Sequence, residues 1–390
     1  MSRLNADGIS LEDAWVDGVL LSGYLDVAFA TEVARVAGQG SRPIFIRGAV
    51  AAGLYVAKKL ENDFNLGRRV SDVARCEEIV MGSVLMPYNT EKSGDEYAII
   101  KVYDCPYAAM VAIQGDPLVC EFCVGYTRGA CERVGSVGVS RLTHIPSGDK
   151  ECTFELKRDS EHGLSKYNLA KVPPSPQYLS TLLQKVQDIL RDKYMKTVAT
   201  EAKPVSALPV SSEEERKTRT LTYIIELRTR VLGGLAFNQA YSACSILGDA
   251  MTYRLGDSAA KMSASLAMNG FPPLAIGWKK KYSITTGITE AQKVASHYMA
   301  SMRIQGEVAG NKIEATKCTL YDMNRDMAET PEVYHLSTFS DPSAERRAIK
   351  AGCKCCDTCL RDLVKTTGVG LEQISCLADG ARSCTWNFKS

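Results

Sequence analysis

The spacing of apolar side chains divides the first part of the chain into helical and strand-like stretches. Residues 1–40 and Phe45–Asn62 carry apolar side chains at helical intervals, so we expect helices there. From Ile79 onward the apolar residues recur at every second position, which predicts two strands around the turn Lys92–Asp95. We expect the second of these strands to cover Tyr97–Tyr103.

A cysteine-rich stretch follows, and its pattern predicts a helix and a hairpin. Cys120–Val134 has helical spacing and ends before glycines, and Val137–His144 alternates like a strand. A turn at 146–149 precedes a second strand, Glu151–Lys157. Such a hairpin brings His144 and Cys152 opposite each other.

The second half is expected to repeat this plan. Pro176–Lys196 is expected to be a helix that precedes it. Further helices are expected at Leu221–Leu232, Phe237–Leu255, Ser258–Met268 and Glu290–Ile304. Leu274–Ile284 has a strand-like pattern, and Glu307–Leu320 predicts a strand pair around Gly310-Asn311. We interpret Asp322–Ala351 as a helical surface elaboration, because the corresponding part of the first half is about twenty residues shorter.

Two stretches share one order of motifs. Cys120–Lys157 and Gly352–Ser390 each open with CxxC, at Cys120/Cys123 and at Cys356/Cys359. Each then has a histidine or cysteine eight residues before a final cysteine, and each ends in an alternating strand. We therefore predict an α+β fold of two duplicated helix-plus-antiparallel-sheet domains with a pseudo-twofold relation.

The predicted domain boundaries follow from a composition change in the middle of the chain. Residues 197–215 are rich in proline, serine and glutamate, which is typical of an exposed linker. We place the first α+β repeat, with its N-terminal helices, at 1–196. The second repeat, with the cysteine-rich C-terminal segment, is placed at 216–390.

Charge and hydropathy narrow the classes of partner. The formal net charge is only +2, so we expect no nucleic-acid partner. No apolar run is long enough to span a membrane, and residues 1–15 lack a secretory pattern. We therefore expect a cytoplasmic protein whose fourteen cysteines are reduced thiols. A small-molecule substrate is the expected partner, and the sequence leaves open whether the chain forms a homo-oligomer.

Clustered thiols in a reducing compartment favour zinc or catalysis over disulfides. The first-half zinc candidates are Cys120, Cys123, His144 and Cys152. The second-half candidates are Cys376 and Cys384 with two of Cys353, Cys355, Cys356 and Cys359. The zinc could be structural or catalytic. The competing interpretation is a set of buried reduced thiols.

Nucleophilic catalysis by a thiol is the second hypothesis. Cys120 and Cys356 begin predicted helices, where the helix dipole lowers the pKa of a thiol, and Cys105 follows a strand end. Asp104, Glu121 or His144 could then act as the general base.

These motifs resemble two families. Glu372, Cys376 and Cys384 resemble the end of the 4-vinyl reductase domain, a small-molecule-binding α+β domain that also occurs in aromatic-effector sensors. That resemblance implies zinc on Cys376 and Cys384, with Cys356 or Cys359 as the upstream ligand. The segments Ala98–Tyr107, CEFCVGY at Cys120, and Gly148–Leu156 resemble the L-2-amino-thiazoline-4-carboxylic acid hydrolase family.

The second resemblance implies a hydrolase that acts on a cyclic amidine-type C–N bond. Its substrate would be L-2-amino-thiazoline-4-carboxylate, opened to N-carbamoyl-L-cysteine on a route of cysteine biosynthesis. The substrate carboxylate needs a cation, which Lys101, Arg128 or Arg141 could supply. The alternatives are a non-catalytic module that binds an aromatic or hydrophobic molecule beside structural zinc, and a metal-binding accessory protein.

Overall fold

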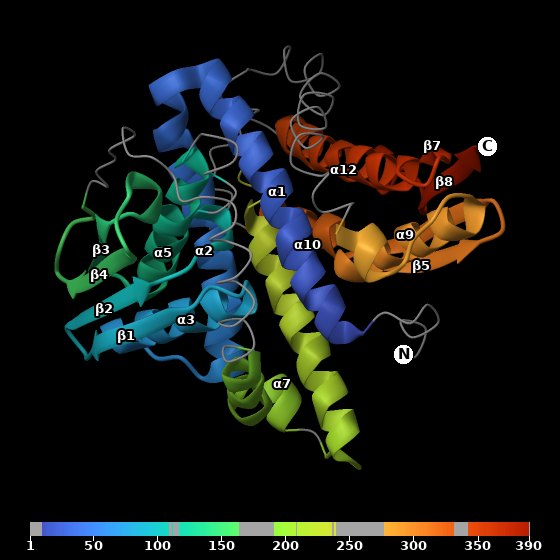
Figure 1. The fold of residues 1–390 in the computed structure, drawn as a ribbon. Coiled ribbons are helices and arrows are strands. Elements are labelled where there is room, and N and C mark those ends of the chain that lie inside the picture. Colours follow the sequence, from blue (N-terminus) through green and yellow to red (C-terminus); the bar gives the residue numbers. More distant parts are fainter. Residues whose placement is uncertain are drawn as a thin grey trace.

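The computed structural model describes residues 10–108, 111, 117–163, 191–207, 209–235, 238, 277–330 and 342–389. These residues form a mixed α+β protein with two four-stranded antiparallel sheets. Figure 1 shows the two sheets on opposite sides of the long helix α1, Leu11–Ala37.

The first sheet has the strand order β1-β2-β4-β3. The first half contains three helices and two hairpins in addition to α1. Its elements are α2 (Ser41–Phe64), α3 (Val70–Ser83), β1 (Tyr88–Ser93), β2 (Tyr97–Val102), α5 (Cys120–Val134), β3 (Val137–Thr143) and β4 (Cys152–Arg158). Short 3-10 helices precede α2 (η2, Gly38–Gly40) and α5 (η3, Pro117–Val119). A third, η4 (Ile145–Ser147), lies in the turn between β3 and β4.

The second sheet has the order β5-β6-β8-β7, which is the order of the first sheet. Helical residues 191–201, α7 (Lys203–Ser206) and helical residues 213–235 lead into this half. Its elements are α9 (Ile288–Ser301), β5 (Ile304–Ala309), β6 (Lys312–Cys318), α10 (Thr319–Glu329), α12 (Pro342–Lys365), β7 (Gly370–Ser375), η5 (Leu377–Asp379) and β8 (Cys384–Lys389). The common strand order is observed, whereas duplication and a twofold relation stay predictions.

Helix α1 contacts the cores of both halves. Ser10 caps its first turn by accepting a hydrogen bond from the Asp13 N–H at 3.0 Å. Trp15 packs in the first core and Leu21 in the second. Asp17 binds His297 of α9 through a 2.7 Å contact to Nε2, and both side chains are buried. One helix therefore supports both sheets.

Helices α2 and α5 touch backbone to backbone, because glycine removes the side chain at the points of contact. A Cβ atom at Gly53 would lie 2.0 Å from the Tyr126 carbonyl oxygen. A Cβ atom at Gly129 would lie 2.3 Å from the Val50 carbonyl oxygen and 2.4 Å from the Leu54 nitrogen. This close approach fixes α5 against α2.

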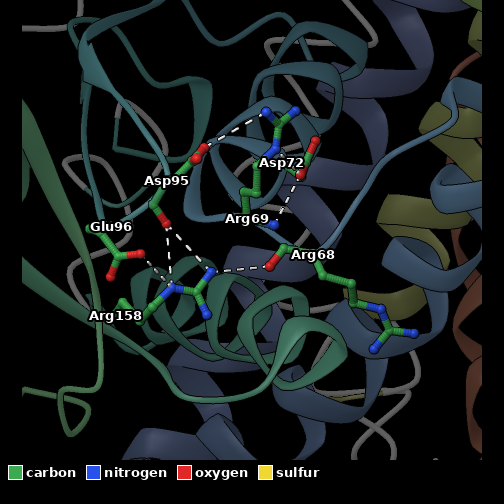
Figure 2. Close-up of polar contacts among 6 residues, drawn as sticks. All are labelled: Arg68, Arg69, Asp72, Asp95, Glu96 and Arg158. Atoms are coloured by element: carbon green, nitrogen blue, oxygen red, sulfur yellow. Dashed lines mark hydrogen bonds and ion pairs between the residues drawn. The ribbon is translucent and has the colours of Figure 1, made fainter.

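An exposed ionic network joins the β1–β2 turn to the start of α3 (Figure 2). Arg158 donates to the Arg68 carbonyl oxygen at 3.1 Å and to the Asp95 carbonyl oxygen at 3.4 Å. Arg69 pairs with Asp72 at 3.2 Å and with Asp95 at 3.7 Å. Exposed ion pairs are each worth less than about 1 kcal/mol, so this network positions the turn more than it stabilises the fold.

Most of the predicted elements are confirmed. The helices at Phe45–Asn62, Cys120–Val134 and Glu290–Ile304 are present with small changes of their ends. The predicted hairpins correspond to β1–β2, β3–β4 and β5–β6, and the predicted final strand is β8. The expected helices at Phe237–Leu255 and Ser258–Met268 lie outside the described residues, apart from Asn238.

Of the two strands expected from Ile79 onward, the first begins later than predicted, at Tyr88, because residues 79–83 belong to the helix α3, Val70–Ser83. Its buried positions, Val70, Val73, Ala74 and Glu77, follow helical spacing, and an Arg69–Asp72 capping box begins it. An apolar run as short as the one at Ile79 fits either structure, so the strand assignment failed where the run alone was used.

Two further expectations need correction. Within the strand-like stretch Leu274–Ile284, residues 277–281 are helical, and Trp278 is buried there. The expected exposed linker at 197–215 includes helical turns up to 201, then α7 and a helix from 213. Val198, Ala202 and Val205 of this stretch are buried in the first core, which polar composition alone does not reveal.

Among the described residues, no helix combines the length and apolarity needed to cross a membrane.

The α2–α5 contact yields the first prediction. Gly129→Ala places a methyl group against the α2 backbone, so the helices must separate, and we expect a loss of about 1–3 kcal/mol in the free energy of unfolding. Urea denaturation measures this loss. Gly40→Ala is the control, since a Cβ atom there meets nothing within 4 Å. Equal stability of the two variants would contradict the close contact.

Candidate functional site

A cavity of about 60 Å³ lies between α3, α5, the first sheet and the helix at 213–235. One water needs about 10–15 Å³, so the space exceeds that of a single water. Its lining is almost entirely apolar, with Val80, Phe122, Phe154 and Val231 supplied by different elements. The polar and sulfur-bearing lining residues are Glu77, Cys105, Cys120, Cys123, Tyr126, Arg141, His144 and Cys152.

Five of the predicted zinc or thiol-catalysis residues meet at this cavity. Cys105 follows β2, Cys120 and Cys123 lie in the first turn of α5, and His144 and Cys152 flank the β3–β4 turn. Residues far apart in sequence are therefore brought together, as the sequence analysis expected.

The β3–β4 turn holds the sulfur of Cys152 in a defined place. The Ile145 N–H donates to Cys152 Sγ at 3.3 Å, and the His144 N–H donates to Asp149 Oδ2 at 2.8 Å. His144 Nδ1 lies 2.8 Å from Ser147 Oγ, which orients the ring. The imidazole and the thiol are therefore fixed by the same turn.

Burial keeps these groups uncharged. Burial raises the pKa of Cys105 and of Cys120 well above the usual range, and it raises the pKa of Cys123 to about 12. Burial and the nearby cations Arg141 and Arg42 lower the pKa of His144 to about 3. The depressed thiol pKa that the helix dipole predicted for Cys120 is therefore outweighed by burial.

Glu121 is engaged in a buried ion pair and lies outside the cavity lining. Arg141 Nη2 donates to Glu121 Oε1 at 2.7 Å, and Arg42 Nε donates to Oε2 at 3.1 Å. Arg141 also donates to the Cys120 carbonyl oxygen at 3.0 Å. Guanidinium groups occupy both carboxylate oxygens, and Glu121 is not in the cavity lining, so this geometry argues against Glu121 as the general base.

The remaining predicted substrate and catalytic residues lie away from the cavity. Lys101 pairs with Glu91 and Glu151 on the outer face of the sheet, each at 2.9 Å. Arg128 donates to the Gly163 carbonyl oxygen at 3.0 Å. Asp104 is half-buried, and burial raises its pKa. Of the three expected cations, Arg141 is the one that lines the cavity.

The sequence analysis missed two polar residues that line the cavity. Glu77 of α3 and Tyr126 of α5 are 3% and 2% exposed. Burial raises the pKa of Glu77 to about 8, although the Thr127 hydroxyl donates to its Oε2 at 3.1 Å. A glutamate among the apolar positions of a helix was the available signal, but no element was predicted for residues 63–78.

The second half gathers its own thiols near the β7–β8 turn. Cys384 donates to Cys376 Sγ at 4.0 Å, and the Leu377 N–H donates to Cys384 Sγ at 3.2 Å. S–H donors from Cys353 and Cys384 lower the pKa of Cys376. The contact of the Leu377 N–H matches that of the Ile145 N–H in the first half, so both turns hold the final cysteine alike.

The sequence analysis compared Cys120/Cys123 with Cys356/Cys359, whereas in the structure the pair one helical turn earlier, Cys353/Cys356, lies near Cys376. Cys353 and Cys356 interact with Cys376, and Tyr298 donates to Cys356 Sγ at 3.0 Å. Cys359 lies one turn further along α12, in the second core and 3% exposed. Cys353 and Cys356 therefore lie with Cys376 in the second half, as Cys123 lies with Cys152 in the first.

Zinc stays a prediction in both halves. A tetrahedral site with Zn–S bonds of about 2.3 Å has sulfur–sulfur edges of about 3.8 Å, close to the Cys376–Cys384 separation of 4.0 Å. Among the described residues, no three or more His, Cys, Asp or Glu side chains are placed to hold one metal ion.

Comparisons with known proteins leave the family open. The chain matches no protein-family model, no curated protein and no solved structure. Both family resemblances of the sequence therefore stay predictions.

The buried Glu77 carboxyl predicts a pH-dependent stability. Its pKa rises from 4.5 to about 8 on folding, so the folded chain keeps a proton that the unfolded chain releases. The contribution of Glu77 to the free energy of unfolding should therefore be largest below about pH 4.5 and fall as pH rises to about 8. Glu77→Gln should remove on the order of 3 kcal/mol of that fall between pH 5.5 and 8.

Urea denaturation at several pH values tests this dependence. Glu307→Gln, at an exposed position of β5, is the matched control and should keep the slope of the wild type. His144 overlaps only the lower part of this window, because its lowered pKa makes stability fall as pH drops from 6.5 to about 3. That contribution is the same in the wild type and in Glu77→Gln, so the comparison isolates Glu77. An unchanged slope in Glu77→Gln between pH 5.5 and 8 would rule out the buried neutral carboxyl.

Proposed function

We propose that the cavity of the first half binds a small, mainly apolar molecule. The observation that carries the proposal is the cavity lining, where apolar side chains surround protonated thiols and a neutral imidazole. Protonated thiols behave as small apolar groups. Burial of apolar ligand surface contributes about 25 cal/mol per Å², which supports binding without any charged contact.

The ion pairing around Arg141 favours an uncharged ligand over a carboxylate. Arg141 is the cation in the lining, and Glu121 already neutralises it at 2.7 Å. A ligand carboxylate would have to compete with that buried partner, which is costly in a low-dielectric site. A binding module for an apolar molecule therefore agrees with the electrostatics better than a site for the thiazoline acid.

Hydrolysis of a cyclic amidine-type C–N bond is the second candidate. It is favoured by the meeting of Cys105, Cys120, His144 and Cys152 at one cavity. His144 is the imidazole in the lining, but its lowered pKa makes it a weak base, which counts against this candidate. Glu121 would act by holding Arg141 in place, and Asp104 lies outside the cavity lining.

Ligand binding is tested with ethylbenzene as the probe. We expect the wild-type protein to bind it, and we expect Val231→Phe to weaken binding at least tenfold because the larger ring occupies the cavity. Isothermal titration calorimetry measures both affinities. Leu142→Phe is the matched control, since Leu142 is 56% exposed on β3. Unchanged affinity in Val231→Phe, or no binding by the wild type, would argue against the proposed function.

The hydrolase candidate is tested with L-2-amino-thiazoline-4-carboxylate. Turnover should release one free thiol per substrate, which a thiol reagent detects after removal of protein. Cys120→Ser should abolish release, whereas Cys131→Ser, at a buried thiol of the same helix outside the cavity lining, should retain it. No thiol release, with zinc supplied, would end this candidate and leave the binding role standing.

A further inference from the structure

Two buried polar atoms of residues that line the cavity have no hydrogen-bond partner among the described residues. They are Glu77 Oε1 and the Tyr126 hydroxyl, and both residues line the cavity. Nearly all buried polar side-chain atoms in folded proteins have a partner. Two unpartnered atoms at one cavity therefore indicate a partner inside the cavity, which is either ordered water or a ligand.

The two groups are neighbours from packed helices. Glu77 lies on α3 and Tyr126 on α5, and these helices are in contact. Thr127, the residue after Tyr126, donates to Glu77 Oε2 at 3.1 Å. Glu77 also contributes electrostatically to the environment of the Tyr126 hydroxyl. One small polar group of a ligand could therefore reach both.

Both groups are hydrogen-bond donors at neutral pH. Burial raises the pKa of Glu77 to about 8 and the pKa of Tyr126 well above its usual range, so both keep their protons. Glu77 Oε2 accepts a hydrogen bond from Thr127, so the carboxyl proton lies on Oε1, which can then donate it in a hydrogen bond. A protonated carboxyl and a phenol in an apolar pocket form an established arrangement for binding an oxygen that carries partial negative charge.

We propose that the Glu77 carboxyl and the Tyr126 hydroxyl together bind the carbonyl oxygen of a small apolar ketone or aldehyde. A carbonyl oxygen has two lone pairs and no proton, so it matches two donors. This inference rests on the proposed binding function, which it extends by naming the polar group of the ligand.

The experiment compares acetophenone with ethylbenzene, which have nearly the same shape but differ in the carbonyl oxygen. Tyr126→Phe and Glu77→Leu should each weaken acetophenone binding at least tenfold and leave ethylbenzene binding within about twofold. Thr127 keeps a second acceptor, the Cys123 carbonyl oxygen at 2.9 Å, when Glu77 is replaced. Tyr97→Phe is the control, because the Tyr97 hydroxyl donates to Glu155 on the sheet surface.

A spectroscopic measurement on the wild type covers the case in which a variant fails to fold. The infrared carbonyl stretch of bound acetophenone should shift to lower frequency than in an apolar solvent, because two donors weaken the C=O bond. An unshifted band would overturn the inference, and so would equal weakening of both ligands by Tyr126→Phe. If ethylbenzene binds and these effects are absent, only the inference fails. If neither molecule binds, the proposed function fails with it.

Discussion

The backbone contact between α2 and α5 is the constraint on which the first half depends. Gly53 and Gly129 leave no room for a Cβ atom at this contact, so the two helices meet at the shortest distance that their backbones allow. Helix α5 supplies Cys120, Cys123 and Tyr126 to the cavity. Because the helix cannot move away from α2 without losing this packing, these side chains are held at fixed positions above the sheet.

Burial then determines the chemistry that these positions allow. The apolar surroundings keep the thiols and Glu77 protonated and His144 neutral, which removes the anionic nucleophile that a catalytic thiol needs. The charged groups nearby, Arg141 and Glu121, neutralise each other at 2.7 Å. The same desolvation that makes catalysis by a free thiolate unfavourable makes the cavity suitable for an uncharged ligand.

The sequence could predict local elements, and it could not predict the electrostatic pairing. The β3–β4 hairpin followed from alternation and a turn, and α5 from helical spacing and a terminal glycine. The partnership of Glu121 with Arg141 joins a helix to a strand and leaves no trace in residue spacing. Glu77 was missed because it precedes the apolar run at Ile79, in a stretch for which no element was predicted.

The cysteine motif of the second half shows a related limit of sequence reasoning. Cys353, Cys356 and Cys359 contain two overlapping CxxC pairs, and all three thiols recur at the spacing of one helix turn. Spacing alone cannot choose between the pairs. The choice depends on where Cys376 and Cys384 lie in space, which only the packing of α12 on the hairpin determines.

A comparison of the two halves locates the proposed ligand site in the first. Helices α3 and α9 both end at a serine followed two residues later by a positive φ, at Leu85 and Arg303. Glu77 lies six residues before Ser83, and the residue six before Ser301 is Ala295. Tyr126 lies three residues after Cys123, and the residue three after Cys356 is Cys359. The second half therefore keeps the turn that holds the final cysteine but has no carboxyl or phenol at these two positions, and its buried phenol, Tyr298, already donates to Cys356 Sγ. A carbonyl ligand would accordingly bind the first half, where the carboxyl and the phenol occur together.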